Sequence, residues 1–376
     1  MKKNHFIYIR GLKKLQNTVM CVGDDGQKTY WDSTFRKSLP FSSGQQVKRS
    51  IVDGMLEILN EDCAPITFYK KEKVKKNKKQ DEDSEKKSEV KTMGEGVVMM
   101  TIDPSYSDML IKGYWETTVS EIKKDVDSRI KRRSPLSISA MTPLHPYLVS
   151  INKENHSFDK RESSNVTVSF TDENYKPLSD TEIESIIKNN PTKANPTQYI
   201  QDVKKSSGLF TYDVCIDIRR LFCVNISDLS KEIYNQTKDE LILKGWKVIE
   251  TNLGKCLIAP NEIIEKISNA ISESLVDWRI TSNQSANYSS METIALAISN
   301  NAKYPIRCIN AEISGDDSAV PIIRKEKETV VFTSPNIKSV TNYIYNDQED
   351  VDDAKDYLSK QIKSLVFEYI NECNNK

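Results

Sequence analysis

The stretch KKEKVKKNKKQDEDSEKKSEVK, residues 70–91, is the feature that most constrains how this chain can fold. Nearly every side chain in it is charged or polar, and no apolar residues recur at a helical or strand spacing. Such a segment cannot bury a core, because it offers too little apolar surface to offset the entropy of ordering it. We therefore expect residues 70–91 to be a mobile charged loop within a folded region.

A second stretch, residues 105–205, also departs from regular patterning. It contains six prolines, many serines and asparagines, and only short periodic segments. We interpret it as a large insertion. The predicted organisation is thus a first half of a core domain over residues 1–104, a large insertion over 105–205, and a second half with a C-terminal helix over 206–376.

The remaining segments carry strand and helix patterns. In GLFTYDVCIDIRRLFCVNI, Tyr212, Val214 and Ile216 alternate with polar or smaller residues, as in a half-buried strand. Glycines such as Gly11 are expected to break strands. Further predicted strands are HFIYIRG, NTVMCVG, APITFYK, GEGVVMMTID, KYPIRCIN and ETVVFTS; predicted helices lie within residues 38–60, in NEIIEKISNAISESLVDW and over 351–373.

Without the insertion, these elements follow the order strand, helix, strand, strand, helix, strand. This order is typical of the ferredoxin-like arrangement that RRM-type RNA-binding proteins use. The predicted fold class is therefore α+β, with a ferredoxin-like (RRM-type) core domain that carries a large insertion.

The first predicted helix, in SLPFSSGQQVKRSIVDGMLEILN, has an unusual first turn. Ser42 or Ser43 is a natural N-cap, and each has a glutamine three residues later, as in a capping box. Capping does not explain Lys48 and Arg49, because the helix dipole mildly disfavours cations near an N-terminus. A bound phosphate would account for them, since backbone N–H groups, hydroxyls and cations would converge on it.

The distribution of charged residues and cysteines restricts the classes of function that fit this chain. The net charge of the 376-residue chain is zero, but residues 1–79 hold 17 Lys or Arg against 8 Asp or Glu, and residues 347–376 hold 4 against 8. This asymmetry fits local binding of a polyanion, head-to-tail self-association, or simply solvated faces. The seven scattered cysteines suit a reducing cytoplasm. No apolar run is long enough for a membrane span, so no membrane partner is expected.

Four segments together resemble one family. SLPFSSGQQVKRSI resembles the serine-rich loop and first helix of the RAMP proteins of CRISPR systems. RRSPLSISAMTPLHPYLVS and GLFTYDVCIDIRRLFCVNI resemble segments of the DevR-like backbone subunit of type I Cascade complexes, and SNQSANYSS takes the place of its polar, nucleic-acid-facing loop. The segments occur in the family's order. The charged loop at 70–91 and the absence of a glycine-rich loop near residue 282 depart from it.

The resemblance implies a hand-shaped subunit with a ferredoxin-like palm and an inserted thumb or finger region within residues 105–205. Copies of such a subunit stack helically along one crRNA. The resemblance further implies other Cascade subunits as partners and target DNA bound through the guide, in the cytoplasm. Phosphate contacts suit this task, because every spacer sequence must be accepted. The residues that the resemblance assigns to RNA binding are Ser42, Ser43, Gln45, Lys48, Arg49, Asn283 and Gln284.

The resemblance also implies a thumb that flips a nucleotide out of the guide at regular intervals. A wedge of this kind needs apolar residues beside cations, and the candidates are Lys131, Arg132, Arg133, Leu136 and Met141. An ordinary packed strand at Leu136 and Met141 is the alternative interpretation.

No enzymatic constellation stands out, so we expect no catalytic residue, metal site or cofactor. Asp24, Asp25 and Asp32 are typical of turns, although a related type III backbone subunit would use an aspartate in this region to cut target RNA. The three histidines are scattered. Alternative functions are this type III-like ribonuclease, a sequence-tolerant RNA-binding protein outside CRISPR, and a purely structural assembly protein.

Overall fold

The structure is a computed structural model with a mixed α/β architecture and several sheets. It describes residues 4–23, 26–76, 89–115, 130–159, 168–189, 197–228, 230–280 and 288–375. Within these ranges no helix has the length and apolarity that a bilayer crossing requires.

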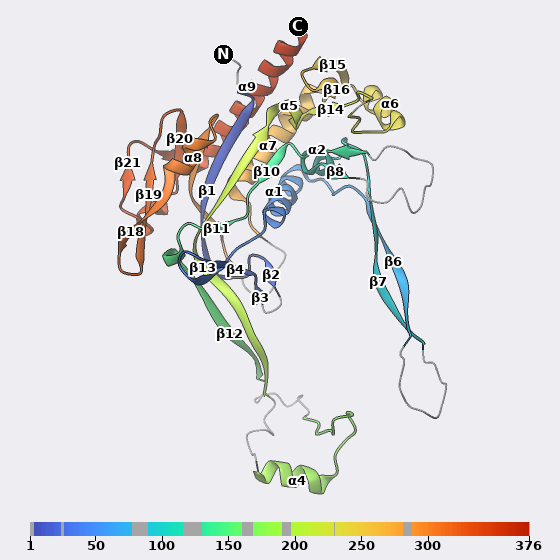
Figure 1. Ribbon diagram of the computed structural model, residues 1–376, viewed down its shortest axis with the longest axis vertical. Helices are drawn as coiled ribbons and strands as arrows, with labels where there is room; N and C mark the ends of the chain where they lie inside the picture. The colour runs from blue at the N-terminus through green and yellow to red at the C-terminus, as the bar shows by residue number, and fades with distance from the viewer. Residues whose placement is uncertain are drawn as a thin grey trace.

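The main sheet is built around β1 (Phe6–Thr18). This strand pairs antiparallel with β13 (Thr197–Asp217) on one side and with β17 (Glu292–Ser299) on the other. β10 (Leu136–Ile138) pairs with the far side of β13, and β20 (Thr329–Thr333) pairs with β17, both antiparallel. Figure 1 shows β1 and β13 running side by side through the centre of the molecule.

Three long helices pack together against the main sheet and complete the principal core. They are α1 (Gly44–Leu59), α7 (Asn261–Asp277) and α9 (Ala354–Asn374). The apolar stripe of α7, which includes Ile264 and Ile271, lies in the same cluster as the β1 residues Ile7 and Ile9. The predicted helices in these three regions are thus confirmed, and the capped helix begins at Gly44.

The sequence suggested that Gly11 breaks a strand, but this prediction is wrong, because Gly11 lies in the middle of β1. A Cβ at this position would be 2.3 Å from a ring carbon of Tyr212 on the neighbouring strand β13. The Tyr212 ring fills that space, and its hydroxyl donates a hydrogen bond to the Leu275 carbonyl on α7 (3.1 Å). A glycine inside a strand can mark such close packing.

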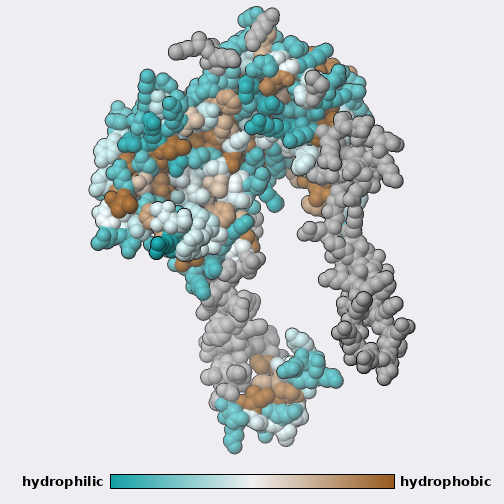
Figure 2. All heavy atoms as spheres, in the orientation of Figure 1, coloured by the Kyte–Doolittle hydropathy of each residue, from teal (hydrophilic) through white to brown (hydrophobic). Residues whose placement is uncertain are grey.

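Two antiparallel hairpins project from the same side of the molecule (Figure 1). The first hairpin consists of β6 (Ile66–Lys76) and β7 (Glu89–Met100). The second hairpin consists of β12 (Val149–Asp159) and the first half of β13, and it leads to α4 (Asp180–Asn189). Figure 2 shows apolar side chains gathered on the α4 segment, where no residue is buried.

Smaller elements complete the architecture. Three-stranded sheets are formed by β14 (Cys223–Asn225), β16 (Gly254–Ile258) and β15 (Lys247–Thr251), and by β18 (Ile309–Gly315), β19 (Ser318–Arg324) and β21 (Ile344–Tyr345). Short strands are β2 (Val22–Gly23), β3 (Gly26–Gln27), β4 (Thr29–Asp32), β5 (Lys37–Pro40), β8 (Tyr114–Trp115), β9 (Lys131–Arg132), β11 (Thr142–Pro143) and β22 (Glu349–Asp350). The remaining helices are α2 (Ser107–Lys112), α5 (Ile218–Leu221), α6 (Asn235–Leu243), α8 (Lys303–Cys308) and the 3-10 turns Pro146–Leu148, Pro335–Ser339 and Val351–Asp353.

The prediction of a loop over residues 70–91 is wrong at both ends of that stretch. Residues 70–76 belong to β6 and residues 89–91 to β7, and Lys71 pairs with Gly94 across the ladder. A two-stranded ladder is made by backbone N–H and C=O groups, so a charged sequence does not exclude it. Residues 77–88 lie outside the part of the chain that the structure describes.

Two other expectations about strands also need correction. KYPIRCIN was expected to be a strand, but Lys303–Cys308 forms α8; Pro305 lies in its first turn, where a missing N–H costs no hydrogen bond. Within the stretch 105–205, β10 and β11 pair with β13 in the main sheet, so this part of the predicted insertion is not separate from the core.

Candidate nucleic-acid interface

The start of α1 explains two of the candidate serines structurally. Ser43 is the N-cap, and its hydroxyl oxygen accepts a hydrogen bond from the Gln46 backbone N–H (3.3 Å). Ser42 is fully buried, exchanges two backbone hydrogen bonds with Met141, and donates its hydroxyl to the Met20 carbonyl. Ser42 therefore anchors the loop before the helix and presents no group to a ligand, contrary to its assignment as an RNA contact.

Gly44, the first residue of α1, brings the helix terminus against the main sheet. A Cβ here would be 2.5 Å from the carbonyl oxygen of Ile138 at the end of β10. The absence of a side chain thus lets the N-terminal turn pack directly on the strand backbone. This contact fixes the position from which the side chains of Gln45, Lys48 and Arg49 extend.

Lys48 and Arg49 both lie within reach of polar neighbours. Lys48 is half-buried, its Nζ donates to the Ser134 hydroxyl (3.1 Å), and burial lowers the pKa of its amine. The Arg49 side chain is 68% exposed, and its Nε lies 3.4 Å from an Asp53 carboxylate oxygen. An exposed pair at this separation contributes little to stability, so the guanidinium is available to another anion.

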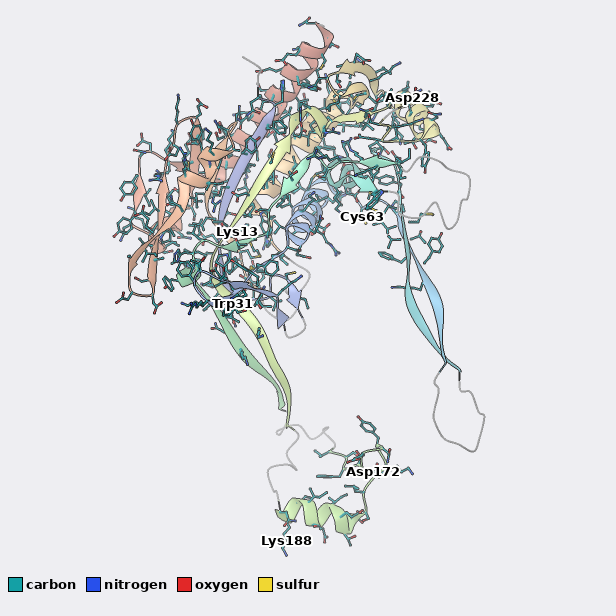
Figure 3. The ribbon with its side chains drawn as sticks, viewed as in Figure 1. Lys13, Trp31, Cys63, Asp172, Lys188 and Asp228 are labelled. Atoms are coloured by element: carbon teal, nitrogen blue, oxygen red, sulfur yellow. The ribbon has the colours of Figure 1, made fainter. Side chains whose placement is uncertain are left out.

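These cations line a cavity of about 770 Å³ between α1 and the base of the first hairpin, which we name the basic groove. In Figure 3, Cys63, which lines it, lies where the chain passes from α1 toward this hairpin. Lys112 at the end of α2 adds a third cation, with Nζ 3.8 Å from Asp53. The lining residues are Gln45, Lys48, Arg49, Asp53, Cys63, Ala64, Pro65, Ile66, Phe68, Met100, Lys112 and Gly113.

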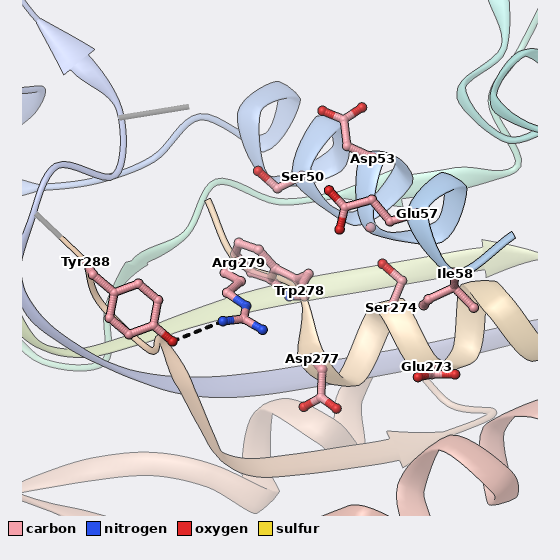
Figure 4. A pocket seen from close by; sticks show the side chains of 11 residues that line it. Ser50, Asp53, Glu57, Ile58, Glu273, Ser274, Asp277, Trp278, Arg279 and Tyr288 are labelled. Carbon is pink, nitrogen blue, oxygen red and sulfur yellow. Dashed lines mark hydrogen bonds between the residues drawn. The ribbon is translucent and has the colours of Figure 1, made fainter. Parts of the chain in front are cut away.

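A second cavity, of about 520 Å³, lies between α1 and the end of α7, and we name it the acidic groove (Figure 4). Its lining contains four carboxylates and the Arg279 guanidinium, which donates to the Tyr288 hydroxyl (3.0 Å). The carboxylates are those of Asp53, Glu57, Glu273 and Asp277. These carboxylates repel phosphate. Binding of a polyanion to α1 is therefore more favourable at the basic groove than at the acidic groove.

The predicted wedge is wrong at Arg132. This side chain is fully buried and forms an ion pair with Glu232 (Nη1 to Oε2, 2.7 Å). It also donates to the carbonyl oxygens of Leu110, Cys223 and Arg220. Arg132 thus joins α2 to the segment around β14, and a guanidinium with all these partners cannot insert between nucleotides.

The wedge is also wrong at Leu136 and Met141, which are 1% and 0% exposed. Leu136 lies in β10 opposite Ile216, so the alternative interpretation of a packed strand is the correct one. Lys131 and Arg133 are exposed, and Lys131 lies over the Trp115 ring. Exposure leaves these two cations free to meet a ligand but does not assign them one.

The remaining candidate residues from the sequence lie neither in the basic groove nor in the acidic groove as far as the structure describes them. Asn283 and Gln284 belong to residues 281–287, and Asp24 and Asp25 to another gap, all outside the described ranges. Asp32 accepts hydrogen bonds from the backbone N–H groups of Thr34 and Phe35, as a turn residue does. Across the described parts of the chain, no cluster of three or more His, Cys, Asp or Glu could hold a metal ion.

Sequence patterns did not single out Lys112 and Phe68 as site residues. Lys112 is the last residue of a six-residue helix that carries no recognisable motif, and Phe68 lies in a predicted strand beside the charged stretch. The available signal was the strand APITFYK, in which consecutive large aromatic residues, Phe68 and Tyr69, cannot both face a core. Only the packing of the hairpin base beside α1 brings Phe68 to the three cations.

No protein-family profile matches the chain, and no curated protein matches it. Among solved structures, it is similar to a chain described as "CRISPR RNA-guided surveillance complex, pre-nicking", with a TM-score of 0.48 and 9% identity over 96% of this chain and 100% of that chain. It is also similar to a chain described as "CRISPR RNA-guided surveillance complex", with a TM-score of 0.41 and 9% identity over 96% and 99% of the two chains.

Proposed function

We propose that this protein is a crRNA-binding backbone subunit of a type I CRISPR surveillance complex. In this proposal, copies of the chain assemble along one guide RNA in the cytoplasm and present it to target DNA beside other Cascade subunits. The protein itself holds the guide and catalyses no reaction.

The observation that carries the proposal is the basic groove. The segment SLPFSSGQQVKRSI, which resembles the RNA-contacting loop and helix of the DevR-like family, supplies three groups to it, those of Gln45, Lys48 and Arg49. Lys112, which no motif singled out, adds a cation to the same lining. The three cations and one amide side chain of the groove outnumber its single carboxylate, that of Asp53, and suit phosphate contacts, which hold RNA without reading its sequence.

The topology also supports a ferredoxin-like palm. β17, β1, β13 and β10 lie in this order, each antiparallel to its neighbour, with α1 between β1 and β10 in the chain and α7 between β13 and β17. This is the strand order that a split βαβ arrangement requires. The second hairpin then extends from the inner strand β13 and is our candidate for the thumb.

The apolar side chains at the end of the second hairpin are consistent with assembly. Tyr175, Val168 and Ile187 are 87%, 39% and 37% exposed there. A helix without a buried face is not stable on its own in water, because most helical stability comes from packing an apolar stripe. We assign the covering surface to the next copy of the chain in the filament.

The proposal is tested by purifying the protein from cells that carry its neighbouring genes and a repeat array, and by sequencing the RNA bound to it. We expect spacers bounded by repeat fragments, with no preference among spacers. Recovery of a broad set of cellular RNAs would identify a sequence-tolerant RNA-binding protein outside CRISPR. Recovery of no RNA would favour a structural assembly protein.

A further inference from the structure

The basic groove has an apolar wall that phosphate binding leaves unexplained. Ile66 pairs with Met100, and Phe68 pairs with Val98, across the first hairpin. Directly opposed residues share a face and alternate residues along a strand share it too, so Ile66, Phe68 and Met100 lie on one face. All three line the groove.

Phe68 is the exposed part of this wall. Phe68 is 65% exposed, and the groove that it lines has room for a ligand. An isolated exposed apolar residue needs no explanation, but an aromatic ring that lines a cavity beside Ile66 and Met100 offers a continuous apolar surface. A flat ring of this kind is a stacking platform for a planar group.

The cations of the groove come from the elements beside this wall. Lys48 and Arg49 project from the first turns of α1, and Lys112 projects from the end of α2. Asp53 is the single carboxylate in the lining, so the formal charge is positive by two. The groove volume of about 770 Å³ lies within the ~300–1,000 Å³ of small-ligand sites.

We propose that the basic groove holds one unstacked nucleotide of a bound single strand, with its base on Phe68 and its phosphate at Lys48, Arg49 and Lys112. This inference rests on the proposed function and deepens it, because it assigns a base-binding position to a surface expected to make phosphate contacts only. Stacking accepts all four bases, since each has a π-face, and so is compatible with any spacer.

The test uses the full-length protein and single-stranded RNA oligonucleotides that carry 2-aminopurine at one position at a time. We expect the fluorescence of at least one labelled position to change on binding the native protein. Phe68→Ala should abolish this change and weaken binding about tenfold, which is within the range for loss of one stacked base. Phe68→Trp should keep both properties. The salt dependence should be unaltered, since no phosphate contact is lost.

Tyr69→Ala is the matched control. Tyr69 is the next residue of the same strand, is 43% exposed, and lies on the opposite face of the hairpin, away from the groove. Neither substitution removes a buried side chain, so both variants should fold. We expect Tyr69→Ala to bind RNA like the native protein. Equal losses of RNA affinity in Phe68→Ala and Tyr69→Ala would overturn the proposal, because the two faces of the hairpin would then contribute equally to RNA binding.

Lys112→Ala separates the two halves of the site. It should reduce the steepness with which the logarithm of the RNA-binding constant falls with the logarithm of salt concentration by ~0.7, the value for one phosphate contact on a single strand. The 2-aminopurine signal should remain. Native affinity in Phe68→Ala would overturn the stacking site while recovery of repeat-bounded spacers still supported the proposed function. An acidic peptide that contains phenylalanine tests the alternative occupant. If this peptide displaces RNA from the native protein, and if Phe68→Ala loses binding of the peptide but keeps binding of RNA, the apolar wall is a site for a protein partner.

Discussion

At the residue scale, neighbouring cations have opposite environments. Lys131 is exposed, whereas Arg132 is buried against Glu232, and both lie in the short strand β9. We expect Arg132→Ala to destabilise the protein by ~3 kcal/mol, because the buried Glu232 carboxylate loses its nearest cation and keeps only Arg220, at 3.4 Å. Urea unfolding measures this change.

Lys131→Ala is the control for the buried pair and should alter stability by less than ~0.5 kcal/mol, as surface substitutions usually do. Native stability in Arg132→Ala, together with weakened RNA binding, would restore the wedge interpretation of Arg132 and contradict the ion pair.

Lys48 and Arg49 provide the residue-scale test of the basic groove. Lys48→Ala combined with Arg49→Ala should weaken RNA binding by a similar factor for unrelated sequences. It should also lower the salt slope by up to ~1.4, since two phosphate contacts on a single strand are lost. Fluorescence anisotropy at several salt concentrations checks both expectations.

The control for this double variant is Lys247→Ala with Lys255→Ala, which removes two exposed cations from β15 and β16 and leaves the groove intact. It should bind like the native protein. A loss that varied strongly with RNA sequence would point to base reading at α1, and an unchanged affinity in the groove variant would leave α1 with a capping role only.

Lys13 predicts a pH dependence of stability. It is fully buried on β1 beside the Trp278 ring, with Nζ donating to the Met291 carbonyl and the Thr293 hydroxyl, and Figure 3 shows it within the sheet. Burial lowers the pKa of its amine from 10.5 to about 7. Between these two values the unfolded chain binds more protons than the folded chain, so rising pH favours the folded state.

We therefore expect the free energy of unfolding to gain up to ~1.4 kcal/mol per pH unit from Lys13 between about pH 7 and pH 10. Lys13→Met should lose this contribution, because a thioether does not titrate. Urea denaturation of both proteins across this pH range compares the two slopes. Parallel pH profiles would show that the amine is protonated to the same extent in both states.

At the element scale, the second hairpin is separable from the core. Lys153 and Lys204 are directly opposed on β12 and β13, so residues 154–203 can be replaced by an Asn-Gly turn that closes the shortened hairpin. We expect thermal stability to be retained, because no residue of the principal core lies in the deleted range. Assembly of several copies on one RNA should be lost, which sedimentation velocity with RNA detects.

The deletion stops short of Ser206, which is buried and donates its hydroxyl to the Thr18 carbonyl. A longer deletion that removes Ser206 is the control, and it should destabilise the protein. Undiminished assembly in the shorter variant would contradict the assignment of the second hairpin as the thumb.

At the scale of the whole molecule, the proposal predicts a guide-holding subunit that cuts no RNA. Asp24→Asn, Asp25→Asn and Asp32→Asn together should leave guide binding and target-DNA binding intact, because neither task uses an ionised carboxylate at these positions. The native complex incubated with Mg²⁺ and a complementary RNA should leave that RNA uncut.

Regularly spaced cleavage that disappears in the triple variant would overturn the type I assignment and establish the type III-like alternative. A divalent ion that assists hydrolysis needs at least one carboxylate to hold it near the scissile phosphate, so these substitutions would abolish such cutting.

The sequence by itself determined the elements whose residues carry a strong local signal. The capped start of α1, the alternating residues of β13 and the apolar stripe of α7 depend on nearest neighbours and on helix or strand periodicity. It did not predict β17, whose buried run ETIALAIS lacks alternation and reads equally well as a helix. The basic character of α1 was likewise readable from Lys48 and Arg49.

Only the tertiary structure decided which charged and aromatic side chains meet. Arg132 is buried because Glu232, 100 residues later in the chain, offers a carboxylate at 2.7 Å. Phe68 belongs to the basic groove because the first hairpin begins beside α1. These outcomes depend on contacts between residues far apart in the sequence, and local propensity carries no information about them. The physical reason is that charge and aromatic surface act through distance and burial, which the fold sets.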